Sequence, residues 1–172
     1  MKIRSLSHVG VTVSSFEKSV KWYYEKFGFR LIDEQILSKE QVKGLHNLYG
    51  LEGAEVRLGF LRAPKGGVVE IFEFSEAQTK TKLAWNSPGL THLTLDVKNV
   101  NRWYKKLLEM GVIFRSPPQK TGVNEWVFLE DPDGNLIELI DLKSNYFVIR
   151  LLGGIAGKVM AKRKFKKYYL SK

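Results

Sequence analysis

The chain opens with an alternation of apolar and polar residues and then changes period. Residues 3–13 alternate and are rich in β-branched side chains, a pattern that predicts a strand. Residues 16–27 instead repeat aromatic and aliphatic side chains at helical spacing. Ser14 or Ser15 is placed to cap this helix at its start, and Gly28 is placed to end it. The chain therefore begins with a strand followed by an amphipathic helix.

Three further strands are predicted in the first half of the chain. They occupy about 29–36, 54–63 and 67–74, and a turn containing proline and two glycines at 63–67 joins the last two. Segment 37–53 has no clear period and is interpreted as irregular. The order of elements in this half is therefore βαβββ.

The same order of elements returns in the second half. Aligning His8 with His92, an offset of 84 residues, also pairs Val13 with Val97, and the helix stop signals agree to within one residue. This agreement across strand, helix and stop signal indicates an internal duplication. The second copy comprises a strand at 90–97, a helix at 99–110, and strands at 112–116, 124–130 and 135–142.

These elements predict an α+β fold made of two βαβββ modules. The first module spans 1–74 and the second spans 89–142, with a polar linker at 75–88 between them. Residues 143–172 match neither copy and are interpreted as a C-terminal extension that is partly helical. A chain of 172 residues suits one compact domain or two packed halves.

The formal net charge of +10 is concentrated in the C-terminal extension. Residues 143–172 hold nine of the 28 Lys and Arg residues and none of the 18 Asp and Glu residues, so the rest of the chain is near neutral. Aromatic and aliphatic residues lie among these cations. The extension therefore favours contact with an anionic lipid surface or another subunit over a disordered tail, and no nucleic-acid partner is expected.

Two absences narrow the chemistry and the expected location. The sequence contains no cysteine, which excludes disulfides, zinc–thiolate clusters and a cysteine nucleophile. A strong metal site must therefore use histidine nitrogen and carboxylate oxygen. The sequence has no apolar run of about 18 residues and no signal-peptide core, so the expectation is a soluble cytoplasmic protein.

Four residues that can bind a metal occupy matching places in the two copies. His8 and His92 lie in the first predicted strand of each half, and Glu70 and Glu138 lie in the last. Each glutamate stands among apolar neighbours, where an unpaired carboxylate is costly to bury. A histidine taken alone is better explained as a satisfied polar residue at a strand edge. Four coincident positions instead favour a metal site.

Two imidazoles and two carboxylates form a donor set that suits one divalent Zn, Ni, Co, Mn or Fe ion. Such an ion can polarise a carbonyl and stabilise an enolate or enediolate, while a carboxylate moves the proton. Glu70 and Glu138 are the candidate catalytic bases. The chemistry expected from this set is proton abstraction beside a carbonyl.

Longer segments resemble a known family. His8–Val13, Trp22–Phe29, Gly89–Val97 and Glu130–Leu139 are similar to motifs of the vicinal oxygen chelate superfamily, the fold of glyoxalase I and the bleomycin-resistance proteins. The resemblance covers about 3–142. It implies a curved mixed sheet around the metal, the four residues above as its ligands, and a homodimer.

The resemblance implies a metal-dependent lyase or isomerase of the glyoxalase type, acting on a small carbonyl compound or a thiol-linked hemithioacetal. Glu70, rather than the glutamine of the epimerase type, favours this assignment, whereas segment 37–53 and the extension depart from a compact glyoxalase I. Fold alone does not fix the reaction. The alternatives are another metalloenzyme of the superfamily, either a dioxygenase or an antibiotic-modifying thiol transferase, and a non-catalytic binding protein of the bleomycin-resistance type.

Weaker candidates accompany these four residues. Phe60, Trp126 and Phe128 are aromatic residues on predicted strands, so they either pack in the core or line a substrate pocket. Arg57 and Arg62 either meet an anionic substrate or are solvated.

Three other features are interpreted without chemistry. His46 is expected to be exposed. Glu73 is expected on the strand face opposite Glu70 because side chains alternate along a strand. Residues 131–135 are expected to form a hairpin turn, because Asp-Gly favours reversal of the backbone.

Overall fold

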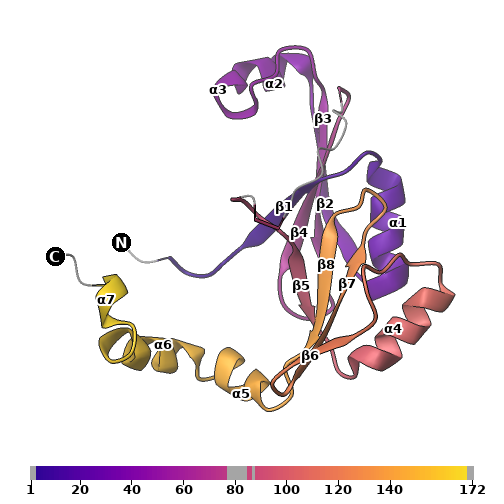
Figure 1. The fold of residues 1–172 in the computed structure, drawn as a ribbon. Helices are drawn as coiled ribbons and strands as arrows, with labels where there is room; N and C mark the ends of the chain where they lie inside the picture. Colours follow the sequence, from indigo (N-terminus) through magenta and orange to yellow (C-terminus); the bar gives the residue numbers. More distant parts are fainter. Residues whose placement is uncertain (1–2, 77–84, 87, 170–172) are drawn as a thin grey trace. The chain divides into compact units, whose positions relative to one another are not determined.

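A computed structural model describes residues 3–76, 85–86 and 88–169 (Figure 1). Residues 77–84 and 87 of the predicted linker lie outside the described part. The chain forms two compact units. Met1–Leu93 and Glu130–Ile137 make the first, and Thr94–Leu129 and Glu138–Lys172 make the second.

The first sheet has four strands in the order β1-β4-β3-β2, and its elements follow the predicted βαβββ order. β1 is His8–Thr12, β2 is Arg30–Leu37, β3 is Val56–Arg62 and β4 is Val68–Phe74. β1 runs parallel to β4, whereas β3 runs antiparallel to both β2 and β4. The α+β fold class predicted from the sequence is confirmed in this half.

The strand predicted at 3–13 is shorter than expected, because β1 begins only at His8. Its partner β4 begins at Val68, opposite His8, so the residues before His8 have no strand of this sheet beside them. Ile3 and Leu6 are accordingly 93% and 84% exposed.

Helix α1, Phe16–Phe27, has the caps that the sequence predicts. The Ser15 hydroxyl accepts a hydrogen bond from the Lys18 backbone, and Gly28 ends the helix with a φ of 74°. The helix packs against the sheet face that carries Gly59. A Cβ atom at Gly59 would lie 2.6 Å from the Phe16 ring, so this position admits only glycine without a shift in the packing.

Segment 37–53, interpreted as irregular, contains two short helices, and that interpretation is wrong. Helix α2 is Lys39–Gly44 and helix α3 is His46–Tyr49. Ser38 and Gln41 form a capping box that starts α2. Buried Val42 packs against β3, with partly buried aromatic residues around it. These helices are too short for a period to show in the sequence.

The predicted turn at 131–135 is confirmed, but it contains a buried carboxyl that the sequence analysis did not identify. Asp131 is 5% exposed and accepts hydrogen bonds from the backbones of Asp133 and Asn135 and from the Asn135 amide. The Tyr23 hydroxyl of α1 also donates to Asp131, at 3.3 Å. Burial raises the pKa of Asp131, although these hydrogen bonds oppose the shift. The turn is thus hydrogen-bonded to α1 within the first unit.

Replacing Tyr23→Phe removes the hydroxyl donor to Asp131 and leaves the ring in place. We expect the free energy of unfolding to fall by about 1–3 kcal/mol, because a buried acceptor loses a partner. Urea denaturation measures the change. Tyr24→Phe is the control because Tyr24 lies in the same helix with 55% of its surface exposed. Equal stability of the two variants would contradict a structural role for this contact.

The second sheet repeats the strand order of the first, as β5-β8-β7-β6. Its strands are β5, Leu93–Asp96; β6, Gln119–Thr121; β7, Asn124–Glu130; and β8, Leu136–Asp141. Helix α4, Val100–Glu109, follows β5 and is capped by Asn99. The prediction of a second βαβββ copy is confirmed.

The strand predicted at 112–116 is wrong in position. That segment makes only an isolated bridge between Phe114 and Leu129, and β6 lies further along the chain. Pro117 and Pro118 separate the two. Proline lacks the backbone N–H that a strand ladder needs, so regular pairing resumes only after them.

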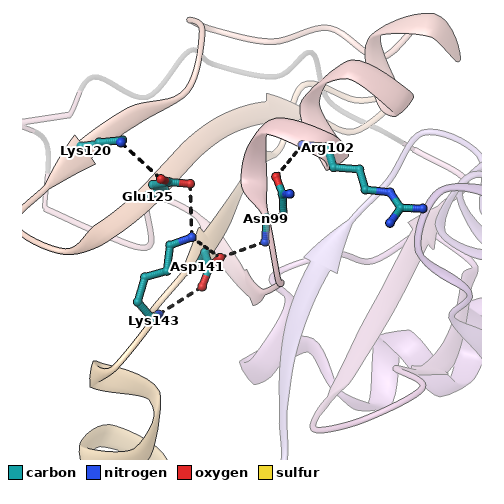
Figure 2. A network of polar contacts seen from close by, with 6 residues as sticks. All are labelled: Asn99, Arg102, Lys120, Glu125, Asp141 and Lys143. Carbon is teal, nitrogen blue, oxygen red and sulfur yellow. Dashed lines mark hydrogen bonds and ion pairs between the residues drawn. The ribbon is translucent and has the colours of Figure 1, made fainter.

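Asp141, at the end of β8, joins α4 to the start of the C-terminal extension (Figure 2). It is 8% exposed and accepts hydrogen bonds from the backbones of Asn99 and Lys143, while the Lys143 ammonium lies 2.7 Å away. Lys143 also lies 3.5 Å from Glu125 on β7. Burial alone would raise the pKa of Asp141, but the Lys143 and backbone hydrogen bonds outweigh it and hold the pKa below its ordinary value.

The variant Asp141→Asn is expected to unfold about 1–3 kcal/mol more easily at neutral pH, since charged hydrogen bonds are lost. Because the folded-state pKa is lowered, the carboxylate stabilises the fold above its ordinary pKa of about 3.9, and this advantage disappears as the pH falls through the folded-state value. The difference in the free energy of unfolding between variant and wild type should therefore become smaller on acidification. Denaturation between neutral and acidic pH measures it. Glu109→Gln, at an exposed position on α4, is the control, and a gap independent of pH would contradict the prediction.

The extension is helical, as predicted. It forms α5, Asn145–Arg150; α6, Gly153–Lys162; and α7, Lys166–Tyr169 (Figure 1). In the described part of the chain, none of the helices combines the length and the apolar character needed to cross a bilayer.

Candidate functional site

The pairing of β1 with β4 brings together the two predicted ligands of the first half. His8 lies opposite Val68 and Gly10 lies opposite Glu70 in this parallel pair. Residues two apart along a strand share a face, so His8 and Glu70 point from the same side of the sheet. His8 Nε2 lies 3.0 Å from Glu70 Oε2, with 38% and 14% of the two side chains exposed. A nitrogen and an oxygen donor thus stand side by side on a partly exposed surface.

This surface is the sheet face opposite α1. Gly59, which contacts the helix, pairs with Ile71, and Glu70 precedes Ile71 in β4 and therefore points the other way. Phe60 lies opposite Glu70 in β3, and its ring packs edge-on to His8 at 5.5 Å. Glu70 therefore stands on the strand between those of His8 and Phe60.

The separation of the two donor atoms fits neighbouring ligands of one metal ion. Metal–nitrogen and metal–oxygen bonds are about 2.0–2.2 Å long, so two ligands at a right angle put their donor atoms about 3.0 Å apart. The observed 3.0 Å agrees with that value and is also the ordinary length of a hydrogen bond between an imidazole and a carboxylate. The residues present fit a divalent cation that prefers nitrogen and oxygen ligands.

Each candidate histidine has a hydroxyl partner from the residue before it. The Ser7 hydroxyl lies 3.1 Å from His8 Nδ1, and the Thr91 hydroxyl lies 2.8 Å from His92 Nδ1. A partner at Nδ1 orients the ring and directs Nε2 towards a ligand. The sequence analysis missed these two residues, although the same offset of 84 that aligns the histidines also aligns them.

His92 immediately precedes β5, whereas the sequence placed it inside a strand. Its ring lies 5.7 Å from that of Trp85. Glu138 lies in β8 between buried Ile137 and Leu139, as its apolar neighbours suggested. The Thr94 hydroxyl of β5 donates to Glu138 Oε2 at 3.0 Å.

Equivalent hydrogen bonds relate the two glutamates. The Val13 backbone donates to the Phe72 carbonyl at 2.8 Å, and the Val97 backbone donates to the Ile140 carbonyl, also at 2.8 Å. Each acceptor stands two residues after its candidate glutamate. The two glutamates therefore occupy corresponding positions in the two copies.

The structure brings His8 and Glu70 into direct contact. His92 belongs to the same compact unit, whereas Glu138 belongs to the second. Within the described ranges, no three or more histidine, aspartate or glutamate side chains gather closely enough to hold a metal ion. The set of four ligands stays a prediction.

The two arginines considered for substrate binding are engaged within the fold. Arg57 pairs with Glu34 at 2.7 Å and with Glu17, and its guanidinium lies 4.3 Å from the centre of the Phe16 ring. Arg62 donates to backbone carbonyls in the turn between β3 and β4. Both residues therefore have a structural role in the first unit.

The remaining candidates lie as follows. His46 is exposed, as expected. Glu73 lies opposite Arg57 in the register of β3 and β4 and points to the face opposite Glu70, which confirms that expectation. The indole N–H of Trp126 donates to Thr121 at 3.0 Å, and its ring packs edge-on to Phe128 at 5.6 Å.

Comparison with known proteins gives two relatives that are named as a lactoylglutathione lyase or a probable one. A lactoylglutathione lyase of Schizosaccharomyces pombe is 25% identical over 146 residues, which cover 81% of this chain and 48% of that protein. The chain thus spans about half the length of this relative. A probable lactoylglutathione lyase of Synechocystis is 27% identical over 141 residues, covering 81% of this chain and 96% of that protein.

Comparison of folds agrees with these relatives. The crystal structure of a glyoxalase family protein from Bacillus cereus matches with a TM-score of 0.67 and 17% identity, over 82% of this chain and 95% of that one. The family model of the Glyoxalase/Bleomycin resistance protein/Dioxygenase superfamily matches residues 5–139, which include most of both copies of the repeat and all four candidate ligands. The chain therefore belongs to this superfamily, which is the vicinal oxygen chelate superfamily.

Proposed function

We propose that the protein is a metal-dependent lyase or isomerase of the glyoxalase type that acts on a small carbonyl compound or a thiol-linked hemithioacetal. The observation that carries the proposal is the pair of His8 Nε2 and Glu70 Oε2, 3.0 Å apart on a partly exposed sheet face. The names of two relatives, at 25% and 27% identity, support the same reaction class.

The proposed ligands are His8, Glu70, His92 and Glu138, and the proposed cation is Zn, Ni, Co, Mn or Fe. Their support is chemical and positional. Two imidazoles and two carboxylates suit these cations. The two glutamates stand at equivalent register positions, and both histidines have a hydroxyl at Nδ1.

In the proposed reaction, Glu70 and Glu138 act as the bases. A bound cation supplies a Lewis acid that polarises the substrate carbonyl and stabilises the charge left when an adjacent proton is removed. One glutamate takes that proton from carbon and returns it to the neighbouring atom. The Thr94 hydroxyl orients the Glu138 carboxylate through Oε2. The Phe60 ring packs edge-on to the His8 ring and restricts its orientation.

Metal content tests the ligand set. Protein purified without metal-affinity resin is expected to contain stoichiometric divalent metal by mass spectrometry, and His8→Ala and Glu138→Gln are expected to lose most of it. After the metal is removed with a chelator, metal added back at a hundredfold excess over its Kd should stabilise the wild type by about 2.7 kcal/mol, seen as a rise in Tm. The variants should gain much less.

His46→Ala is the matched control, since His46 is exposed and lies outside the proposed ligand set. It should bind metal as the wild type does. A wild-type protein without metal, whose Tm does not respond to Zn, Ni, Co, Mn or Fe, would refute the ligand set and the metal-dependent reaction together.

Turnover tests the reaction itself. Wild-type protein loaded with metal is expected to convert methylglyoxal in the presence of one of a panel of thiols. Glu70→Gln and Glu138→Gln should each lower kcat by about 100-fold or more, because a general base typically contributes about 10²–10⁴-fold.

Glu73→Gln is the control for this experiment. Glu73 lies in the same strand as Glu70 but on the opposite face, so its variant should keep wild-type kcat. A metal-loaded protein with no turnover across the panel would exclude the glyoxalase reaction and leave another activity of the superfamily.

A further inference from the structure

The C-terminal extension exposes an unusual amount of apolar surface. Its described residues place seven aliphatic and five aromatic side chains at positions between 37% and 71% exposed. They are Tyr146, Phe147, Val148, Ile149, Leu151, Leu152, Ile155, Val159, Met160, Phe165, Tyr168 and Tyr169. Apolar side chains exposed in such number within one short segment point to an interaction site.

Apolar and cationic side chains stand next to each other on the helices of the extension. On α6, Ile155 and Val159 stand one helical turn apart, and Lys158 and Lys162 flank them at the same spacing. Long lysine side chains can bury their stems and keep the ammonium groups in water. α5 carries apolar residues on nearly every side, so water alone is a poor surrounding for it.

The positive charge of the extension favours a negatively charged partner. Residues 143–172 contain nine Lys and Arg residues and no Asp or Glu. A second copy of the chain is disfavoured as the partner, because two extensions repel each other and the rest of the chain, with 19 cationic and 18 acidic residues, has no excess of negative charge. The partner is therefore an anionic surface of another kind.

The apolar side chains distinguish among anionic surfaces. Nucleic-acid binding uses cations on phosphates and aromatic rings on bases, and aliphatic side chains contribute little to either contact. A lipid interface takes up both aliphatic and aromatic residues, with lysines at the headgroups. We propose that α5–α7 form an anchor that holds the protein on an anionic membrane surface, with the helices lying in the interface.

Vesicle sedimentation of the full chain tests this proposal. We expect binding to vesicles of phosphatidylcholine and phosphatidylserine at a ratio of about 7:3 and none to phosphatidylcholine alone, with release by high salt. The triple variant Lys158→Gln, Lys162→Gln, Lys166→Gln should bind the anionic vesicles about 100-fold more weakly, since each surface lysine contributes about fivefold. The double variant Ile155→Ser, Val159→Ser should lose at least about tenfold.

Matched controls remove the same charge or apolar surface elsewhere. Lys18→Gln, Lys65→Gln, Lys105→Gln lowers the net charge equally at exposed positions, and Ile32→Ser, Leu48→Ser removes two exposed apolar side chains. Both controls should bind as the wild type does. All variants should keep the wild-type Tm, because the substituted residues are exposed.

Four results would overturn the proposal. They are equal binding to neutral and anionic vesicles, unchanged binding by the triple variant, tighter binding to a 20-nucleotide single strand than to anionic vesicles, and loss of self-association by the extension variants without any vesicle binding. The first two results would show that charge does not hold the protein on the membrane. The third would indicate a nucleic-acid surface, and the fourth a subunit interface.

Discussion

In each repeat the first strand lies beside the last strand, and the candidate site depends on this arrangement. In the first sheet β1 and β4 are parallel, and Gly10 lies opposite Glu70. His8 stands two residues before Gly10, so its imidazole lies on the same face as the Glu70 carboxylate and contacts it. A register shift of one residue would turn Glu70 towards α1, where an ionised carboxylate would be buried against apolar side chains. Packing of α1 on the opposite face therefore disfavours such a shift and keeps Glu70 beside His8.

The strongest local signals in the sequence were sufficient to predict most of the fold. Helix α1 was located by Ser15, Gly28 and an apolar stripe, all of which act within a few residues. The contact between His8 and Glu70 is long-range. It could be predicted because a histidine and a glutamate recur at matching positions of the two aligned copies. The hydroxyl partners Ser7 and Thr91 were equally visible in the alignment of the copies.

The features that sequence did not predict depend on contacts between distant segments. Asp131 resembles an ordinary turn residue, and only packing against Tyr23 of α1 explains why its carboxyl is buried. Helix α2 is stabilised by burial of Val42 against β3 more than by any period of its own. The bridge at Phe114 replaces a full strand because Pro117 and Pro118 interrupt the ladder.

Several cations before the extension and the first cation within it have partners supplied by the fold. Arg57 and Arg62 are held by carboxylates and turn carbonyls within the first unit. Lys143, at the start of the extension, is likewise paired, with Asp141 and Glu125. Beyond Lys143 the sequence offers no further acid, so its remaining cations have no carboxylate of their own segment to meet. Since these cations stand among exposed apolar side chains, electrostatic attraction and apolar burial favour the same kind of partner, an anionic interface.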